Sequence, residues 1–125
     1  MEDSDRVVIS VPARGEFART LRVAGAELAA RANLRIDEIE DMRLAVEEAF
    51  VFACDRAGSG SVTFAFGVSP GSVELMVGPM PGNCGEGGDG AEERYSRFIL
   101  EHVCDEYEML ERQDGCYVRL VKRTE

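Results

Sequence analysis

The chain has 125 residues, of which 45% are apolar, so it is long enough to form one domain with a buried core. Its formal net charge of −10 argues against a nucleic-acid partner, because phosphates attract basic surfaces. No apolar run approaches the roughly 18 residues of a membrane span, and the first residues lack a signal peptide's features, so we expect a cytoplasmic protein with no membrane partner.

The hydrophobic pattern predicts five strands and three helices. In chain order, we expect a strand over 6–11, helices over 16–32 and 37–56, strands over 62–68 and 73–77, a helix over 92–104, and strands over 107–110 and 117–121. The strands on either side of Ser69-Pro-Gly-Ser72 should pair as a hairpin, and Asp114-Gly115 is a second hairpin signal. Antiparallel strands with helices on one face predict an α+β fold, a two-layer α/β sandwich with residues 1–125 as one domain.

The three predicted helices are amphipathic, and the apolar side of the first contains Phe17, Leu21, Ala24 and Leu28. Asp37 and Glu40 have the spacing of a capping box at the start of the second helix. The apolar stripe of that helix contains Ile39, Met42, Val46, Ala49 and Ala53. The apolar side of the third helix contains Tyr95, Phe98, Ile99 and Val103.

The four cysteines do not match the spacing of a zinc site, and we expect no bound metal. A cytoplasmic location favours reduced thiols. We expect Cys54, Cys104 and Cys116 to be small core residues. Cys84 follows Gly82 in a glycine-rich loop, so it is the thiol that a reagent should reach first.

The segment Asp37-Glu-Ile-Glu-Asp-Met-Arg-Leu-Ala-Val-Glu-Glu-Ala49 resembles the nucleotide-site helix of the bacterial anti-sigma-factor serine/threonine kinases. That family is a branch of the ATPases that include histidine kinases and Hsp90. Residues 73–77, 100–106 and 117–123 are similar to three further pieces of the family, in the same order. The resemblance implies the same sandwich fold, with a mostly antiparallel sheet and helices on one face.

The resemblance also implies roles for two positions on the second helix. Family members carry a glutamate that acts as the catalytic base and, four residues later, an asparagine that holds Mg²⁺. Here Glu48 occupies the glutamate position and Phe52 occupies the asparagine position. Magnesium requires oxygen ligands, which a phenyl ring does not have. We therefore expect the Phe52 ring to fill space that a nucleotide occupies in the relatives, and Glu48 to be catalytic only if the chain is an active kinase.

The two glycine-containing boxes of the family are also altered. After the strand over 73–77 the family has Asp-x-Gly, in which the aspartate binds adenine. Counting from that strand, Pro79 occupies the aspartate position and Pro81 the glycine position. Proline offers neither a side-chain acceptor nor an N–H group. At the second box, the glycine positions hold Arg94 and Ser96. The glycines just upstream are Gly85, Gly87, Gly88 and Gly90, which could serve a shifted lid or form a plain surface loop.

These departures favour a binding protein over an enzyme. The leading hypothesis is an anti-sigma-factor-like regulator, a pseudokinase that binds a sigma factor or an antagonist protein and needs no cofactor. Arg19 and Arg22, with Arg14, would contact the partner, and the resemblance implies a homodimer. The alternative is an active serine kinase that uses ATP and Mg²⁺ to phosphorylate an antagonist. A third possibility is a scaffold domain that dimerises with an active paralogue.

Overall fold

The computed structural model describes residues 4–58, 60–82, 84 and 91–125. Within them, a five-stranded antiparallel sheet has the strand order β1-β2-β3-β5-β4. The elements are β1 (Asp5–Pro12), a 3₁₀ turn (Gly15–Phe17), α1 (Ala18–Arg31), α2 (Ile36–Ala57), β2 (Ser61–Ser69), β3 (Ser72–Met80), α3 (Ala91–Val103), β4 (Glu106–Arg112) and β5 (Gly115–Arg123). The predicted order of elements and the predicted two-layer fold are confirmed.

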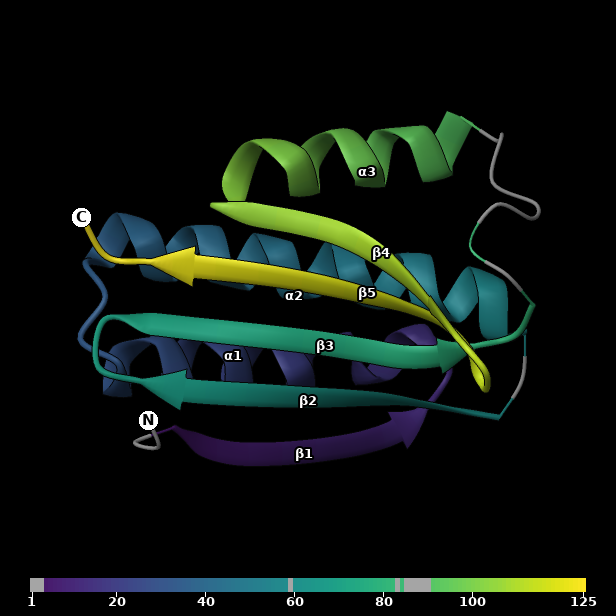
Figure 1. Ribbon diagram of the computed structural model, residues 1–125, viewed down its shortest axis with the longest axis horizontal. Helices are drawn as coiled ribbons and strands as arrows, with labels where there is room; N and C mark the ends of the chain where they lie inside the picture. Colours follow the sequence, from purple (N-terminus) through teal and green to yellow (C-terminus); the bar gives the residue numbers. More distant parts are fainter. Residues whose placement is uncertain (1–3, 59, 83, 85–90) are drawn as a thin grey trace.

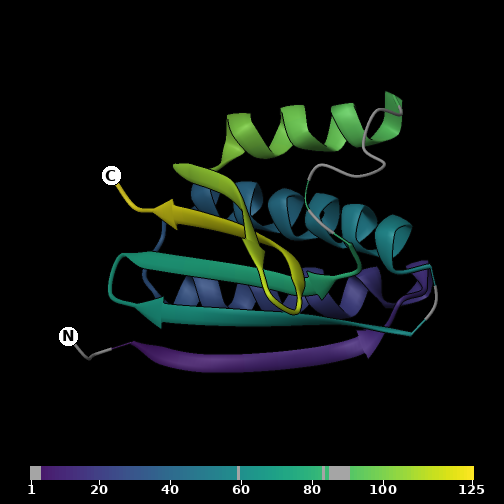
Figure 2. The ribbon, with the colours of Figure 1, turned by 45° about the vertical axis from the view of Figure 1, so that its right-hand side comes forward.

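Helices α1 and α2 lie against one face of the sheet, and α3 lies beside α2 on the side of the edge strand β4 (Figure 1). The turned view in Figure 2 shows the same arrangement of sheet and helices. Among the helices that the structure describes, none has the length and apolar character needed to cross a membrane.

The core lies between the sheet and helices α1 and α2. Strand β2 alternates as predicted, because Phe64 and Phe66 are fully buried and their neighbours are partly exposed. Its hairpin with β3 closes with Ser69 opposite Ser72. Helix α1 contacts α2 closely at Gly25, where an added Cβ would lie 2.8 Å from a methyl carbon of Val46.

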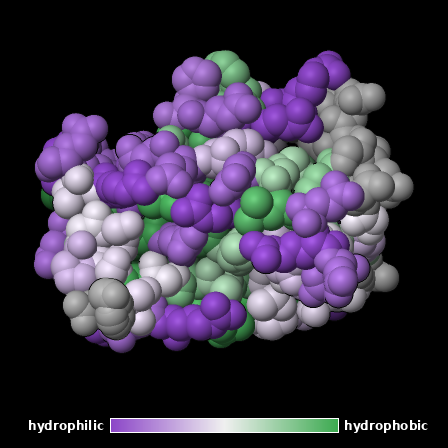
Figure 3. Space-filling model, viewed as in Figure 1, coloured by the Kyte–Doolittle hydropathy of each residue, from purple (hydrophilic) through white to green (hydrophobic). Residues whose placement is uncertain are grey.

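No described element covers the other face of the sheet, where Figure 3 shows hydrophilic residues next to exposed apolar ones. Arg119 of β5, the strand between β3 and β4, donates to Glu106 and Glu108 at 3.0 Å, and also to Glu74. A hollow of about 710 Å³ on this face is lined by residues that include Arg6 and Tyr117.

The start of α2 differs from the prediction. The helix begins at Ile36, and the capping carboxylate is Glu38, whose Oε1 accepts a hydrogen bond of 2.7 Å from the backbone N–H of Arg35. The predicted capping box of Asp37 and Glu40 is wrong, because their carboxylates pair with Arg35 and Arg43. The predicted helix start was one residue late, which displaced the cap.

Glu38 also anchors the C-terminus, because its Oε2 accepts a hydrogen bond of 3.0 Å from the backbone N–H of Glu125. The side chain is 96% buried. The backbone hydrogen bond from Arg35 lowers the pKa of Glu38 below its ordinary value of 4.5, against the opposing effect of burial. The ionised carboxylate therefore stabilises the folded state.

This lowered pKa predicts a specific loss of stability in acid. The contribution of Glu38 is complete above the ordinary carboxyl pKa and is lost as the pH falls through the lowered folded-state pKa. We expect Glu38→Gln to unfold at lower urea than the natural protein at pH 7, with the difference shrinking below about pH 4.5. Urea titrations from pH 7 to pH 3 measure this, with Glu40→Gln at an exposed ion pair as control. A difference that stays constant across this range would contradict the assignment.

Helix α3 places a different side toward the protein than the sequence predicted. Leu100 and Ser96 are buried, whereas Tyr95 is 63% exposed and Phe98 is 56% exposed. The ring of Phe98 stacks against His102 on this outer side, with ring centroids 4.1 Å apart. The prediction that Tyr95 and Phe98 belong to the core is therefore wrong. Helix α3 packs mainly against α2, and the buried residues that the structure describes in α3 are Ser96 and Leu100.

Candidate functional site

One face of α2 carries the candidate site. Glu48, Phe52 and Arg56 follow one another at four-residue steps, so their side chains lie along the same side of the helix. Helix α3 is beside the Glu48 end of this row, and Cys84, which follows β3 in the chain, lies at the Arg56 end. Along α2, Glu48 is contacted by Ser96 of α3, Phe52 follows one turn later, and Arg56 after it is contacted by Cys84.

The Glu48 carboxylate is bound by a neighbouring side chain. Ser96 of α3 donates its hydroxyl to Oε1 of Glu48 at 2.9 Å. Ser96 is only 3% exposed, whereas Glu48 retains partial contact with solvent. A buried hydroxyl needs such a partner, since leaving it unpaired would cost about 1–3 kcal/mol. The bond joins α2 to α3 beside the carboxylate that the family resemblance implies as a base.

Phe52 is part of the packed interior. Its side chain is 1% exposed, and the guanidinium of Arg56 lies over its ring, with the guanidinium carbon 4.9 Å from the ring centroid. Phe50 is also buried, but it packs on Phe64, with ring centroids 6.2 Å apart. Phe52 therefore presents no oxygen ligand, and Arg56 covers its ring.

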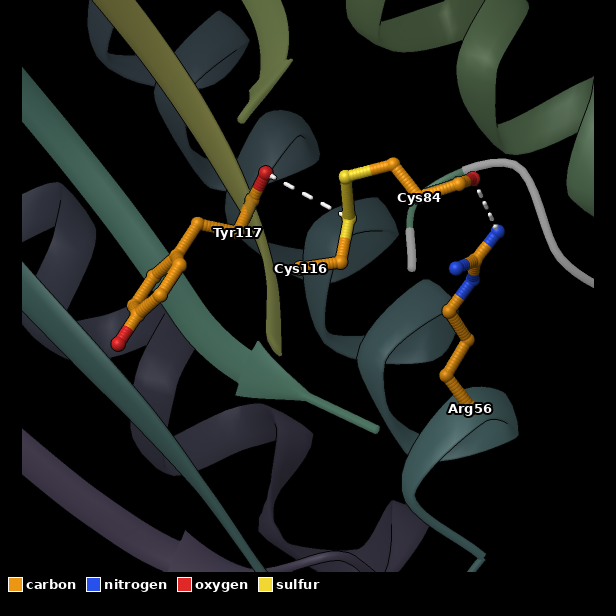
Figure 4. The surroundings of a disulfide bond; sticks show 4 residues. All are labelled: Arg56, Cys84, Cys116 and Tyr117. Carbon is orange, nitrogen blue, oxygen red and sulfur yellow. Dashed lines mark hydrogen bonds between the residues drawn. A yellow bond between two sulfur atoms is a disulfide. The ribbon is translucent and has the colours of Figure 1, made fainter. Parts of the chain in front are cut away.

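The segment after β3 is attached at two points. Arg56 Nη2 donates to the backbone carbonyl of Cys84 at 3.2 Å, and Cys84 forms a disulfide with Cys116 near the start of β5 (Figure 4). The Cα atoms of the two cysteines are 5.1 Å apart. The expectation that Cys84 is a reduced, reactive thiol is wrong. Cys116 is fully buried as predicted, but it is half of a disulfide bond.

The two other cysteines are free. Cys54 and Cys104 are half-buried and pack against the edge of the core. Burial raises the pKa of the Cys104 thiol to about 12, and burial together with the charge of Asp55 raises that of Cys54. Both thiols therefore form little thiolate at neutral pH.

The structure separates the predicted proline positions from Phe52. Pro79 is exposed and lines the hollow on the open face of the sheet, opposite the face that α2 covers. The pairing of β3 with β5 shifts between Val77 and Met80, so Pro79 lies in an irregular part of the strand. Its assignment to the family's first box stays a prediction. Pro81 is exposed beyond the end of β3. The predicted loop glycines Gly85, Gly87, Gly88 and Gly90 lie outside the described residues.

The predicted partner-binding arginines differ in whether they form ion pairs within the protein. Arg22 pairs with Glu47 of α2 at 3.2 Å, and Arg14 pairs with Glu16 at 3.7 Å. Arg19 is exposed at the start of α1, and no ion pair to it occurs among the described residues. Of these side chains, Arg19 keeps its charge most available to another molecule.

Sequence reasoning did not identify three parts of this site. Ser96 was considered only as a missing glycine, but it is the partner of Glu48. The contact of Arg56 with Phe52 could have been found from their four-residue spacing. The Cys84–Cys116 bond has no signal in the spacing of the cysteines. Within the described ranges, no group of three or more His, Cys, Asp or Glu side chains is placed to hold a metal ion.

Comparison with known proteins adds a relationship to this geometry. The chain is 31% identical over 80 residues to the serine-protein kinase RsbW of Bacillus cereus, and 30% identical over 80 residues to the proteins of the same name from Bacillus mycoides and Bacillus thuringiensis. Each alignment covers 62% of this chain, which spans about half the length of these curated relatives. No family model matches the chain. The predicted resemblance is nevertheless supported by these relatives: over the aligned residues, the chain is similar to serine-protein kinases of the anti-sigma-factor type.

Proposed function

We propose that this protein is an anti-sigma-factor-like regulator that acts by binding a sigma factor or an antagonist protein, without using ATP. The observation that carries the proposal is the buried position of Phe52 on α2, at the place where the family resemblance implies a magnesium ligand. In this proposal, recognition of a protein partner is retained and phosphoryl transfer has been lost.

The contacts around Phe52 support the loss of the nucleotide site. Magnesium binds through carboxylate, amide or carbonyl oxygens, and the Phe52 ring supplies none. Arg56 occupies the space above the ring, and Ser96 engages the Glu48 carboxylate. Binding a nucleotide in the family's manner would require these contacts to break. The residues present on this face of α2 therefore do not fit a Mg-ATP complex.

The arrangement of charge on α1 supports a protein partner. The chain is strongly acidic, yet α1 begins with exposed basic side chains. Arg22 is held by Glu47, which fixes its position, while Arg19 projects into solvent. A planar, permanently charged guanidinium suits a carboxylate of a partner protein. We propose Arg19 as the main contact and Arg22 as a secondary one.

Reversing the charge of Arg19 should weaken capture of the partner. We expect Arg19→Glu to cost about 2 kcal/mol, roughly a thirtyfold loss of affinity for the bound sigma factor, since arginines are common interface hot spots. Pull-down from a panel of purified sigma factors, followed by titration of any that bind, measures this. Arg31→Glu is the control, because it changes charge equally at the exposed far end of α1. Equal capture by both variants would exclude Arg19 from the interface, and capture of none of the panel would count against the proposal.

The second candidate function is an active serine kinase for an antagonist protein. The names of the relatives favour it, because the matched proteins are serine-protein kinases. Glu48 would then be the base, and ATP and Mg²⁺ would be the cofactors. This reading requires an open site beside α2, with Arg56 and Ser96 displaced. A nucleotide titration separates the two candidates.

The remaining proposals concern assembly and location. By family resemblance we propose a homodimer that works in the cytoplasm and contacts neither nucleic acid nor membrane. Sedimentation analysis of the purified chain tests the oligomeric state directly. A monomer at every accessible concentration would exclude the dimer and leave the Arg19 surface to act alone.

A further inference from the structure

We infer that the Cys84–Cys116 bond is a redox-responsive site, which exchanges with low-molecular-weight thiols at Cys84 and controls how firmly Arg56 covers Phe52. This inference does not depend on the proposed function. It rests on the unequal burial of the two sulfur-bearing residues, the link from Cys84 to α2, and the raised pKa values of the remaining thiols.

The two halves of the disulfide differ in access. Cys116 is fully buried, near the beginning of β5, whereas Cys84 retains partial exposure. Thiol–disulfide exchange requires an attacking thiolate to approach a sulfur in line with the bond, so access decides which sulfur is attacked. A small thiol should therefore attack Sγ of Cys84, and Cys116 should be the leaving thiolate.

The exchange balances in atoms and electrons. The thiolate of a small thiol forms a mixed disulfide with Cys84, and the Cys116 thiolate takes a proton from solvent. A second small thiol then attacks the mixed disulfide, which releases Cys84 as a thiolate and yields the small-molecule disulfide. In the reverse direction, the small-molecule disulfide is reduced to two thiols while the two cysteines lose two electrons and two protons to form their bond.

The disulfide connects the Arg56 end of the α2 site to strand β5 of the sheet. Cys116 is fixed in β5, Cys84 is bonded to it, and the carbonyl of Cys84 accepts a hydrogen bond from Arg56 at 3.2 Å. The same Arg56 guanidinium lies over the Phe52 ring. Figure 4 shows the Arg56 guanidinium pointing toward the carbonyl of Cys84, whose side chain extends the other way to its disulfide with Cys116. Breaking the disulfide removes the covalent restraint on Cys84 and so weakens the support for Arg56.

A purely structural role does not account for the presence of this disulfide. A chain of 125 residues with this extensive apolar core does not need a disulfide to fold, unlike the small secreted domains in which such bonds compensate for a small core. Cys54 and Cys104 are poor competitors for exchange, because burial raises the pKa of both thiols. Thiol–disulfide exchange should therefore take place at the Cys84–Cys116 pair.

The first test measures the exchange on the full chain. The protein is equilibrated in mixtures of reduced and oxidised glutathione, quenched with acid, alkylated and weighed intact. We expect a reversible transition between four alkylated thiols and two. In the double variant Cys54→Ala/Cys104→Ala it should become a transition between two and none, and in Cys84→Ser it should be abolished. In oxidised glutathione, Cys116→Ala should carry the mixed disulfide at Cys84 at least about tenfold faster than Cys84→Ala carries it at Cys116. Four alkylated thiols in every mixture, a transition that survives Cys84→Ser, or equal rates in the last two variants would each overturn the inference.

The second test asks whether the bond restrains the α2 site. Amide hydrogen exchange is compared between the oxidised and reduced forms of the Cys54→Ala/Cys104→Ala protein. We expect amides in the last turns of α2, residues 52–57, to exchange roughly tenfold faster after reduction, while those in the middle of α1 change less. An unchanged rate in α2, or the same acceleration in both helices, would contradict the link between Cys84 and the Phe52 cover.

Discussion

Removing the Phe52 ring should destabilise the protein by about 3–5 kcal/mol, the loss typical of a buried phenylalanine replaced by alanine. Phe52 is 1% exposed and lies under the guanidinium of Arg56, so Phe52→Ala would leave a cavity beneath a charged group. Since domains are usually stable by only about 5–15 kcal/mol, this single change would remove a large part of the total. Urea unfolding followed by circular dichroism measures it.

Phe98 provides a matched control for this experiment. It is the same residue type in α3 but is 56% exposed, so Phe98→Ala should cost less than about 1 kcal/mol. A comparable loss at both positions would mean that burial does not set the effect. A loss below about 1 kcal/mol for Phe52→Ala would show that the space around this ring is already loose, contrary to a filled site.

Reducing the Cys84–Cys116 bond should lower the stability by about 4 kcal/mol, the second large effect. The bonded residues are 32 positions apart, and closing a loop of that length restricts the unfolded chain by about this free energy. The measurement compares urea midpoints with and without a phosphine reductant in the Cys54→Ala/Cys104→Ala background, which prevents disulfide exchange with the free cysteines. The Cys84→Ser variant in the same background should show no effect of the reductant. A difference below about 1 kcal/mol in the parent would contradict this expectation.

The loss of the Phe52 ring and the reduction of the disulfide affect residues that are linked through Arg56. Phe52 fills the space on α2, Arg56 covers the ring, and the disulfide holds the chain segment that Arg56 contacts. The destabilisation expected from Phe52→Ala should therefore not simply add to that from reduction, because the two changes share Arg56. The double perturbation provides the coupling free energy between them.

Much of the fold was predictable because its signals are local. The alternation of β2 placed Phe64 and Phe66 on the buried face, and the Asp114-Gly115 pair correctly indicated the turn between β4 and β5. The apolar stripe of α2 predicted the burial of Met42 and Val46. These signals are side-chain periodicity and a local turn preference, and both can be read from short stretches of the sequence.

The errors arose where the decisive contacts are distant in sequence. The stripe through Tyr95 and Phe98 is a valid apolar helix face, but α3 turns Ser96 and Leu100 toward α2 instead. Pro79 lies where the β3–β5 pairing shifts, an irregularity that counting residues along the sequence does not reveal. The disulfide joins residues that only the folded sheet brings together, so no spacing rule could predict it.

For the site itself, the sequence indicated that Phe52 stands at the family's asparagine position on α2. It did not indicate which residues contact that face of the helix. The family resemblance singled out Glu48 and Phe52 by position, and the structure places both on one face of the helix. The interactions of that face with Ser96, Arg56 and Cys84 come from three separate parts of the chain. The partner surface on α1 was predicted from charge alone, and the structure distinguishes the paired Arg22 from the exposed Arg19.

Titration with ATP in the presence and absence of Mg²⁺ tests the central proposal most directly. The melting temperature of the full chain is measured in its oxidised and reduced forms, with the serine-protein kinase RsbW of Bacillus cereus as the comparison protein. A ligand at a hundred times its dissociation constant stabilises a native protein by about 2.7 kcal/mol, which would raise the Tm by several degrees. We predict no Mg²⁺-dependent rise for this chain in either form. A rise of several degrees that requires both ATP and Mg²⁺ would contradict the loss of the nucleotide site and favour the kinase.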